Sequence, residues 1–201
     1  MYSAFINSLG SVSYERNYPL SSFNRYGTGG DADVIVFPKT EGELRYVCSL
    51  LKGDIPYLVI GGGSNILISD KGYRGVVIST TKLKSIEVKG CLLTAECGVK
   101  TADLVNEMLK SSFSGLEFTV GIPATVGGAV CMNAGCYGKT ISEKVRYVVT
   151  NKGVYNANEC GFGYRKSRFL NSNEVIIKAC FSLRPEESDY IEDKINKGIE
   201  L

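Results

Sequence analysis

The sequence predicts an α+β fold organised in two lobes. Short β-favouring apolar runs alternate along the chain with helical patterns that have one apolar face. Hydrophobic residues make up 44% of the chain and charged residues 22%, which is typical of a globular protein. The 201 residues are enough for one large domain or two small ones.

The first lobe is expected over residues 1–80 and begins with a strand at 34–37. Thr40 and Glu43 match a capping box, which predicts that a helix starts there. Gly53 is expected to end this helix. The helix would bury residues spaced i, i+3, i+4 and i+7, namely Leu44, Val47, Cys48 and Leu51. Further strands are expected at 57–60, 66–68 and 76–78, with a turn at 70–72.

The second lobe is expected over residues 81–185. A hairpin at 86–88 and 92–97 would be closed by Lys89-Gly90, and Thr101 would cap a helix. Its apolar face would hold Leu104, Val105, Met108 and Leu109. Later strands are expected at 145–149, 153–155 and 175–183. The charged segment 186–201 is expected to be a solvated tail, or a linker to a substrate-binding lobe that is missing from this sequence.

Composition excludes several classes of function. The net charge of +2 and the lack of a basic run argue against nucleic acid or an anionic membrane as partner. No apolar run approaches the roughly 20 residues of a membrane span, and no secretory signal is visible. The seven cysteines form no C-x-x-C pair and the chain has no histidine, which argues against zinc and against Ser-His or Cys-His catalysis. We therefore expect a protein of the reducing cytoplasm, without a metal.

The loop Gly61-Gly62-Gly63-Ser64-Asn65 is the first motif that suggests a ligand. Three glycines allow backbone N–H groups to approach a phosphate closely. The loop is not a Rossmann fingerprint, because strand-like residues rather than a helix follow it. A flexible turn between strands is an equally good interpretation of this motif alone.

The segment 121–128 is long, glycine-rich and nearly uncharged, which favours a buried wall against a flat ring. Tight packing between the lobes is the alternative. Further on, Gly138-Lys139-Thr140 imitates a P-loop, but Asn133 stands where that motif needs glycine.

An arginine beside a tyrosine, Tyr164-Arg165, follows an apolar segment. A guanidinium next to an apolar pocket is the natural partner of a carboxylate or a developing enolate. From the residues alone, an exposed basic cluster with Arg168 is the stronger interpretation.

Taken in order, the motifs resemble those of the UDP-N-acetylenolpyruvoylglucosamine reductase family. The resemblance extends from about Pro19 to Leu183. It rests on five ordered sets of residues: Asn24…Gly27-x-Gly29-Gly30-x-Ala32, Gly61-Gly62-Gly63-Ser64-Asn65, Gly121-Ile122-Pro123…Gly127-Gly128, Asn133-Ala134-Gly135-x-Tyr137-Gly138 and Gly163-Tyr164-Arg165-x-Ser167.

The resemblance implies a two-lobed FAD-binding fold of the vanillyl-alcohol-oxidase (PCMH) type. NADPH would reduce the FAD, which would reduce an enolpyruvyl UDP-sugar to UDP-N-acetylmuramate for peptidoglycan. Arg165 would be catalytic and would bind substrate together with Tyr164. The residues implied to contact FAD are Gly61, Gly62, Gly63, Ser64, Asn65, Ile122, Pro123, Thr125, Gly127, Gly128, Asn133 and Gly135.

The chain departs from the family downstream of the Tyr-Arg motif. Complete members carry there a serine that protonates the intermediate, in a Gly-Ser-x-Phe-Lys-Asn-Pro-like stretch, and a glutamate near the C-terminus. Neither is found before Leu201, and Ala124 stands where many members have glycine. The alternatives are therefore a non-catalytic FAD-binding module, one half of an enzyme completed by a separate C-terminal lobe, or an oxidoreductase with another acceptor.

Overall fold

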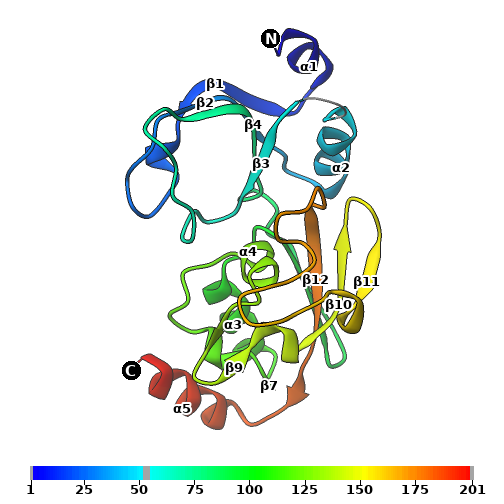
Figure 1. The fold of residues 1–201 in the computed structure, drawn as a ribbon. Coiled ribbons are helices and arrows are strands. Elements are labelled where there is room, and N and C mark those ends of the chain that lie inside the picture. The colour runs from blue at the N-terminus through cyan, green and yellow to red at the C-terminus, as the bar shows by residue number, and fades with distance from the viewer. Residues whose placement is uncertain (1, 52–54, 200–201) are drawn as a thin grey trace. The chain divides into compact units, whose positions relative to one another are not determined.

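The computed structural model describes residues 2–51 and 55–199. The chain divides into two compact units, unit 1 (Met1–Leu83) and unit 2 (Lys84–Leu201), each with its own β-sheet (Figure 1). Both contain helices and strands, as the predicted α+β class requires.

Unit 1 contains a four-stranded sheet in the order β1-β2-β4-β3. The strands are β1 (Ser13–Pro19), β2 (Asp31–Phe37), β3 (Tyr57–Ile60) and β4 (Tyr73–Ser79), and the short helices α1 (Ser3–Ser8) and η1 (Leu20–Ser22) flank β1. β1 pairs with β2 in antiparallel fashion, whereas β2 and β3 both run parallel to β4. The predicted strands at 34–37, 57–60 and 76–78 are confirmed.

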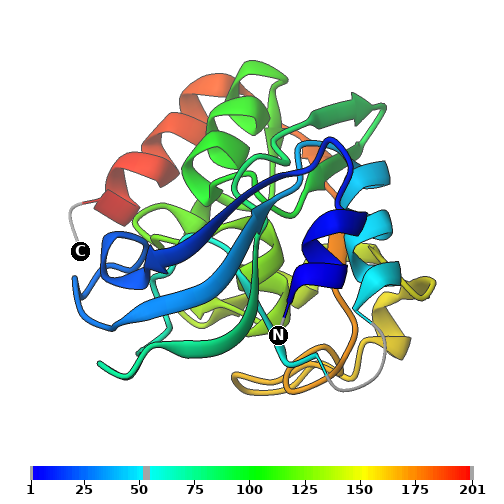
Figure 2. The ribbon, with the colours of Figure 1, turned by 90° about the horizontal axis from the view of Figure 1, so that it is seen from above.

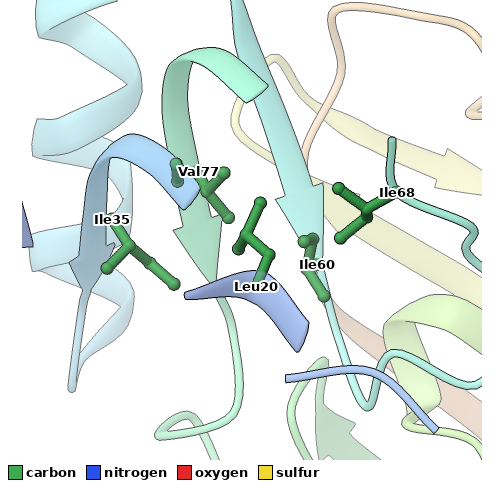
Figure 3. Packing of buried hydrophobic residues seen from close by; sticks show 6 residues of the cluster. Leu20, Ile35, Ile60, Ile68 and Val77 are labelled. Atoms are coloured by element: carbon green, nitrogen blue, oxygen red, sulfur yellow. The ribbon is translucent and has the colours of Figure 1, made fainter. Parts of the chain in front are cut away.

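Six buried apolar residues form the core on one side of this sheet: Leu20, Ala32, Ile35, Ile60, Ile68 and Val77 (Figure 3). The predicted strand at 66–68 is wrong, because these residues form no strand. Ile68 is buried in the core, while Leu67 is 78% exposed. The apolar run thus supplies one core side chain from a loop, without a partner strand to extend the sheet.

Helix α2 (Glu41–Leu50) begins after the predicted cap Thr40, but Glu43 bonds to the N–H of Lys39 rather than to that of Thr40, so the box is not reciprocal. The Thr40 hydroxyl accepts from the Glu43 N–H at 3.1 Å, and the Glu43 carboxylate accepts from the Lys39 N–H at 2.7 Å. Leu44 and Val47 are buried, as the apolar spacing predicts. The predicted helix end at Gly53 lies outside the described residues.

Unit 2 contains an antiparallel sheet in the order β11-β10-β12-β6-β5. Its strands are β5 (Ile86–Lys89), β6 (Leu92–Glu96), β10 (Val145–Thr150), β11 (Val154–Asn156) and β12 (Ile176–Ser182). The predicted hairpin is present, but Lys89 pairs with Leu92, so its turn is Gly90-Cys91, one residue later than expected. Gly90 has φ +55°, a conformation that glycine adopts without strain.

Two helices of unit 2 are central to the site. They are α3 (Thr101–Lys110) and α4 (Val126–Cys131), and α4 packs against β12 and β6. The prediction that Thr101 caps α3 is wrong. Thr101 is the first helical residue, and its hydroxyl donates to the Ile122 carbonyl at 2.5 Å instead of accepting from the helix.

The charged segment after Arg184 is ordered rather than an extended tail. β13 (Arg184–Pro185) pairs with β7 (Phe113–Ser114), and α5 (Ser188–Ile199) lies beside α3 (Figure 2). Ile191 of α5 is fully buried. The helix packs against α3, η2 (Glu117–Thr119) and β7, so one face of an otherwise charged segment is covered. The remaining short elements are β8 (Gly135–Cys136), β9 (Lys139–Thr140), η3 (Ile141–Glu143) and η4 (Ala157–Glu159).

Across residues 2–51 and 55–199, no helix combines the length and apolar character needed to cross a membrane. The same residues contain no group of three or more acidic or cysteine side chains placed to hold a metal ion.

Candidate functional site

The glycine loop of unit 1 directly follows the carboxyl end of β3. Gly63 has φ +67°, and a Cβ at this position would lie 2.2 Å from the Phe23 carbonyl oxygen. The Gly63 carbonyl in turn accepts from the Arg25 N–H at 3.2 Å. Only glycine therefore fits here, and the loop is fixed against the segment 23–25. The packing of the loop against residues 23–25 therefore explains why position 63 is glycine, without a ligand.

A row of hydroxyl groups, Ser79-Thr80-Thr81, ends the neighbouring strand β4. Both the N–H and the hydroxyl of Thr80 donate to the Ile60 carbonyl, at 3.0 and 3.3 Å, and Ser79 and Thr81 share a hydrogen bond of 2.9 Å. These residues lie at the carboxyl edge of parallel strands, where open α/β sheets commonly bind ligands. No motif in the sequence predicted these residues, although a hydroxyl run directly after a buried strand is a visible signal.

A hollow on unit 1 adjoins the glycine loop. It is lined by Tyr26, Asn65, Ile66 and Leu67. Tyr26 and Leu67 are 63% and 78% exposed. An aromatic ring, an aliphatic side chain and an amide thus lie together at the surface, which suits a partly apolar ligand.

In unit 2, the segment from Ile122 to Gly127 runs alongside the loop between β6 and α3. The N–H groups of Val126 and Gly127 donate to the carbonyls of Val99 and Cys97, at 2.8 and 2.9 Å. A Cβ on Gly127 would lie 2.8 Å from the Cys97 Cβ, so this glycine is needed for close packing within unit 2. The segment thus forms a wall of unit 2 that is hydrogen-bonded through its backbone, in which Thr125 and Val126 are buried and Pro123 is exposed.

Thr125 stands out in this wall. It is 4% exposed, and among the described residues its hydroxyl oxygen has no hydrogen-bond partner. Buried hydroxyl groups are nearly always paired in native proteins, so an unpaired one requires an explanation. A Cβ on Gly128 would lie 3.6 Å from this oxygen, which is ordinary van der Waals contact.

Asn133, just after α4, ties three segments together. Its side-chain amide nitrogen donates to the Gly163 carbonyl at 2.9 Å, and its oxygen accepts from the Ser142 N–H at 3.2 Å. A Cβ on Gly135 would lie 2.4 Å from the Lys139 carbonyl oxygen. Asn133 and Gly135 therefore serve the packing of this corner, and the Asn133 amide has its hydrogen bonds within the protein.

Tyr164 and Arg165 form the tip of a tight turn. Gly163 and Lys166 exchange backbone hydrogen bonds of 3.0 and 3.2 Å at its base. Tyr164 is 92% exposed, and Arg165 has φ +50°, which is uncommon for a residue other than glycine. The guanidinium of Arg165 donates to the Gly135 carbonyl at 3.3 Å and lies 5.8 Å from the centre of the Tyr164 ring.

The structure thus brings the predicted residues together in two groups. Within unit 1 the glycine loop adjoins the hollow and the hydroxyl row. Within unit 2 the helix α4 has Thr125 at its start, with Asn133, Gly135 and the turn carrying Arg165 near its end. Ile122 and Pro123 lie on the wall before α4, where the Ile122 carbonyl accepts from Thr101.

Residues 32–159 match the family described as FAD binding domain. The fold and the glycine-lined walls therefore define a FAD-binding flavoprotein domain. A UDP-N-acetylenolpyruvoylglucosamine reductase from Caldicellulosiruptor bescii is 38% identical over 86% of this chain, and one from Carboxydothermus hydrogenoformans is 40% identical over 90%. The chain belongs to the UDP-N-acetylenolpyruvoylglucosamine reductase family.

Solved structures agree with this assignment. The crystal structure of UDP-N-acetylenolpyruvylglucosamine reductase from Thermus caldophilus matches 94% of this chain and 68% of its own length, with 30% identity and a TM-score of 0.80. A cholesterol oxidase matches with a TM-score of 0.68 at 14% identity, which shows the fold alone. The predicted two-lobed α+β fold of the vanillyl-alcohol-oxidase type is confirmed.

The chain spans about three fifths of the curated relatives it matches, 57% of the first and 62% of the second.

Proposed function

We propose that this chain binds FAD and contributes the flavin-binding part of a UDP-N-acetylenolpyruvoylglucosamine reductase. The observation that carries the proposal is the buried, unpaired hydroxyl of Thr125 in a glycine-lined wall. A ligand with hydrogen-bonding ring atoms would give this hydroxyl a partner, and the isoalloxazine ring of FAD fits that description. The family relationship supports the same cofactor.

Two sets of residues are proposed to contact the cofactor. In unit 1 the backbone of Gly61, Gly62 and Gly63, followed by Ser64 and Asn65, would bind the pyrophosphate, because glycine backbones allow N–H groups to reach phosphate oxygens. In unit 2 the wall residues Ile122, Pro123, Thr125, Gly127 and Gly128 would line the ring system. Asn133 and Gly135 would lie behind this wall and keep its shape.

Bound FAD would accept hydride from NADPH and supply it to the enolpyruvyl double bond of the UDP-sugar. Arg165 would hold the substrate carboxylate and stabilise the negative charge that develops beside it, with the Tyr164 side chain at the substrate. A guanidinium offers two parallel donors to a carboxylate, and its charge is permanent. The exposed turn that carries Arg165 suits a group that must meet a ligand. This reaction would serve the synthesis of peptidoglycan precursors.

The enolate carbon also needs a proton, and we assign no donor for it among residues 2–51 and 55–199. We propose that a separate C-terminal lobe supplies this donor. The second candidate is a FAD-binding module that does not itself catalyse. The observation that favours it is the match of residues 32–159 to a FAD binding domain, which implies the cofactor but no catalytic residue.

NADPH oxidation separates the two candidates. The FAD-loaded chain is mixed with NADPH and UDP-N-acetylenolpyruvoylglucosamine, alone and with a separately expressed C-terminal lobe of a relative. The reductase proposal predicts oxidation that depends on the UDP-sugar, in the chain alone or after the lobe is added. If the FAD-loaded chain stays unresponsive to the UDP-sugar in both mixtures, the module interpretation is correct.

Thr125→Val tests the role of the unpaired hydroxyl, because valine has the same shape but no hydroxyl. We expect the substitution to leave the stability of the free chain unchanged or raised, since an unpaired buried polar group is removed. The affinity for FAD should fall by about tenfold, the effect of one lost hydrogen bond of about 1–1.5 kcal/mol. Thr119→Val is the matched control, because the Thr119 hydroxyl already donates to Leu116 at 2.7 Å. If Thr125→Val leaves the affinity for FAD unchanged, the Thr125 hydroxyl does not contact the cofactor.

A further inference from the structure

The turn that carries Arg165 belongs to a longer excursion of the chain, residues 160–168. The Arg168 N–H donates to the Cys160 carbonyl at 2.8 Å and closes the base of this excursion. The Cys160 thiol is fully buried and donates to the Asn156 carbonyl at 3.3 Å, and burial raises its pKa to about 11. The thiol therefore stays protonated near neutral pH and acts as an anchor rather than as a nucleophile.

One side of the excursion is fixed to the end of α4. Besides the bond from Asn133 to the Gly163 carbonyl, the Ser167 hydroxyl donates to the Cys131 carbonyl at 2.6 Å. Ser167 is 3% exposed. These bonds hold the flank of the turn that faces α4.

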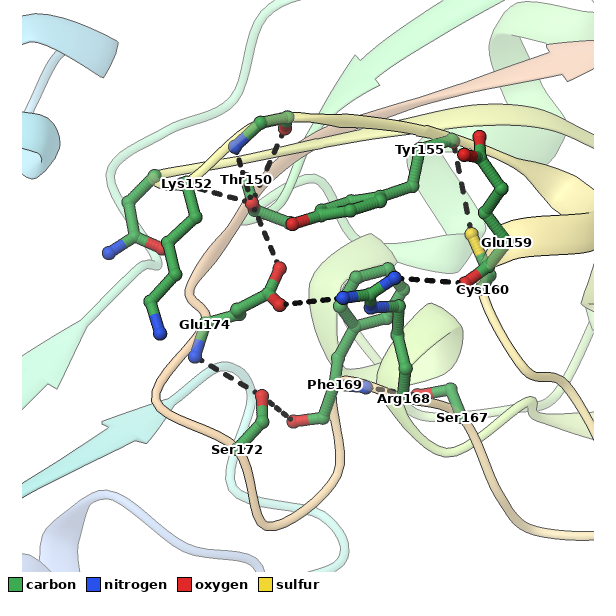
Figure 4. Close-up of polar contacts among 12 residues, drawn as sticks. Thr150, Lys152, Tyr155, Glu159, Cys160, Ser167, Arg168, Phe169, Ser172 and Glu174 are labelled. Carbon is green, nitrogen blue, oxygen red and sulfur yellow. Dashed lines mark hydrogen bonds and ion pairs between the residues drawn. The ribbon is translucent and has the colours of Figure 1, made fainter.

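The other side is fixed by the side chain of Arg168 (Figure 4). Its guanidinium carbon lies 3.9 Å from the centre of the Tyr155 ring on β11, within the range of a cation–π contact. One nitrogen forms an ion pair with Glu174 at 3.1 Å, and another donates to the Glu159 carbonyl at 3.2 Å. A flat, forked group thus makes three contacts at once, which a lysine ammonium does not reproduce.

Glu174 is itself well fixed. Its side chain is only 10% exposed, and its second oxygen accepts from the Thr150 hydroxyl at 3.3 Å. The Tyr155 phenol belongs to the same network: desolvation, and then its hydrogen bond to Glu174, raise its pKa. Phe169 packs against the Tyr155 ring with a centroid separation of 6.1 Å. Glu174 is shielded, whereas the Arg168 side chain is 38% exposed, so the number of partners rather than burial of the ion pair fixes the geometry.

We propose that Arg168, through Glu174 and Tyr155, is a positioning residue for Arg165, and this rests on the proposed role of Arg165 in substrate binding. Only two residues separate the arginines, so a shift at Arg168 moves the base of the Tyr164-Arg165 turn. The contacts of Arg168 with Tyr155, Glu174 and Glu159 hold one flank of the turn, and the bonds to α4 hold the other. The Arg165 guanidinium thereby keeps its place beside Gly135. Arg168 was expected to be part of an exposed basic cluster; its side chain is 38% exposed, and its charge is paired with Glu174 and stacked on Tyr155.

The test compares the unchanged chain with Arg168→Ala, Arg168→Lys and the control Arg184→Ala. Arg184 also pairs with a glutamate, Glu186, at 3.5 Å. The Arg184 side chain is 61% exposed, and this residue is far from the turn in the sequence. The first readout is amide hydrogen exchange. In Arg168→Ala we expect the hydrogen-bonded amides of Gly163, Lys166 and position 168 to exchange roughly tenfold faster. Arg168→Lys should restore little, and Arg184→Ala should change none of them.

The second readout is the affinity of the FAD-loaded chain for UDP-N-acetylenolpyruvoylglucosamine, followed by flavin absorbance. Arg168→Ala should weaken it roughly tenfold, and the double variant Arg165→Ala/Arg168→Ala should be no weaker than Arg165→Ala alone. Losses that add in the double variant would overturn the positioning role, as would unchanged amide exchange in Arg168→Ala. If the unchanged chain binds FAD but not the UDP-sugar, both alone and with the separate C-terminal lobe, the proposed function is wrong, while amide exchange still tests the contacts of Arg168.

Discussion

Gly63→Ala is expected to destabilise unit 1 by about 2–4 kcal/mol and to abolish FAD binding at micromolar concentrations. Two costs add at this position. The backbone has φ +67°, which an L-residue adopts only with strain, and the new Cβ would lie 2.2 Å from the Phe23 carbonyl oxygen. That neighbour is backbone, so it cannot rotate away, and the loop must move. Because the loop is the proposed pyrophosphate site, its movement should remove the cofactor as well.

Gly10→Ala is the matched control for Gly63→Ala. Gly10 is also in unit 1 and has φ +59°, but nothing lies within 4 Å of a Cβ placed there. Only the conformational cost of about 1 kcal/mol should appear, and FAD affinity should be unchanged. Hydrogen exchange at the central strand β4 measures the stability of unit 1, and flavin absorbance measures cofactor binding. Equal effects of the two substitutions would show that the loop tolerates movement.

Arg165→Ala is expected to lower the turnover of the UDP-sugar by about 10²–10³-fold, the usual effect of removing one group that stabilises a developing negative charge. FAD binding should be unchanged, because the Arg165 side chain contacts Gly135 and Tyr164 rather than the proposed flavin wall. The measurement is NADPH oxidation in the mixture that turns over, together with a FAD titration of the same variant.

Lys166→Ala is the control for Arg165→Ala, since it removes a neighbouring positive charge from the same turn. The turn itself should persist, because Lys166 bonds to Gly163 through backbone groups. Turnover should stay close to that of the unchanged chain. If Arg165→Ala loses its flavin together with its activity, Arg165 has a structural role. If the turnover of both variants falls equally, a general loss of positive charge is the cause.

Local patterns in the sequence predicted most of the fold. Thr40 and the apolar spacing behind it predicted α2, and β-favouring runs predicted the strands of the two larger sheets except β1, whose residues are mostly exposed. The prediction of a strand at 66–68 was wrong because a short apolar segment has the same composition in a strand and in a loop that places a side chain, Ile68, in a core. Thr101 failed because its hydroxyl meets the Ile122 carbonyl, a partner 21 residues away in the chain.

The candidate site was predicted only in part, because local patterns do not show long-range contacts. Glycine loops and the Tyr164-Arg165 pair are visible locally, but the support of that pair is not. The contacts of Arg168 with Tyr155 and Glu174 depend on how β11 packs against the segment that leads to β12. No rule of residue spacing predicts this packing. The unpaired hydroxyl of Thr125 likewise becomes visible only when burial and hydrogen bonds are known.

A FAD titration tests the central claim most directly. The purified chain, freed of any flavin, is titrated with FAD while the absorbance and fluorescence of the flavin are followed. The account predicts saturable binding of one FAD per chain at micromolar or lower concentration, weakened in Thr125→Val and lost in Gly63→Ala but not in Gly10→Ala. A folded chain that leaves the flavin spectrum unchanged at all concentrations would contradict it.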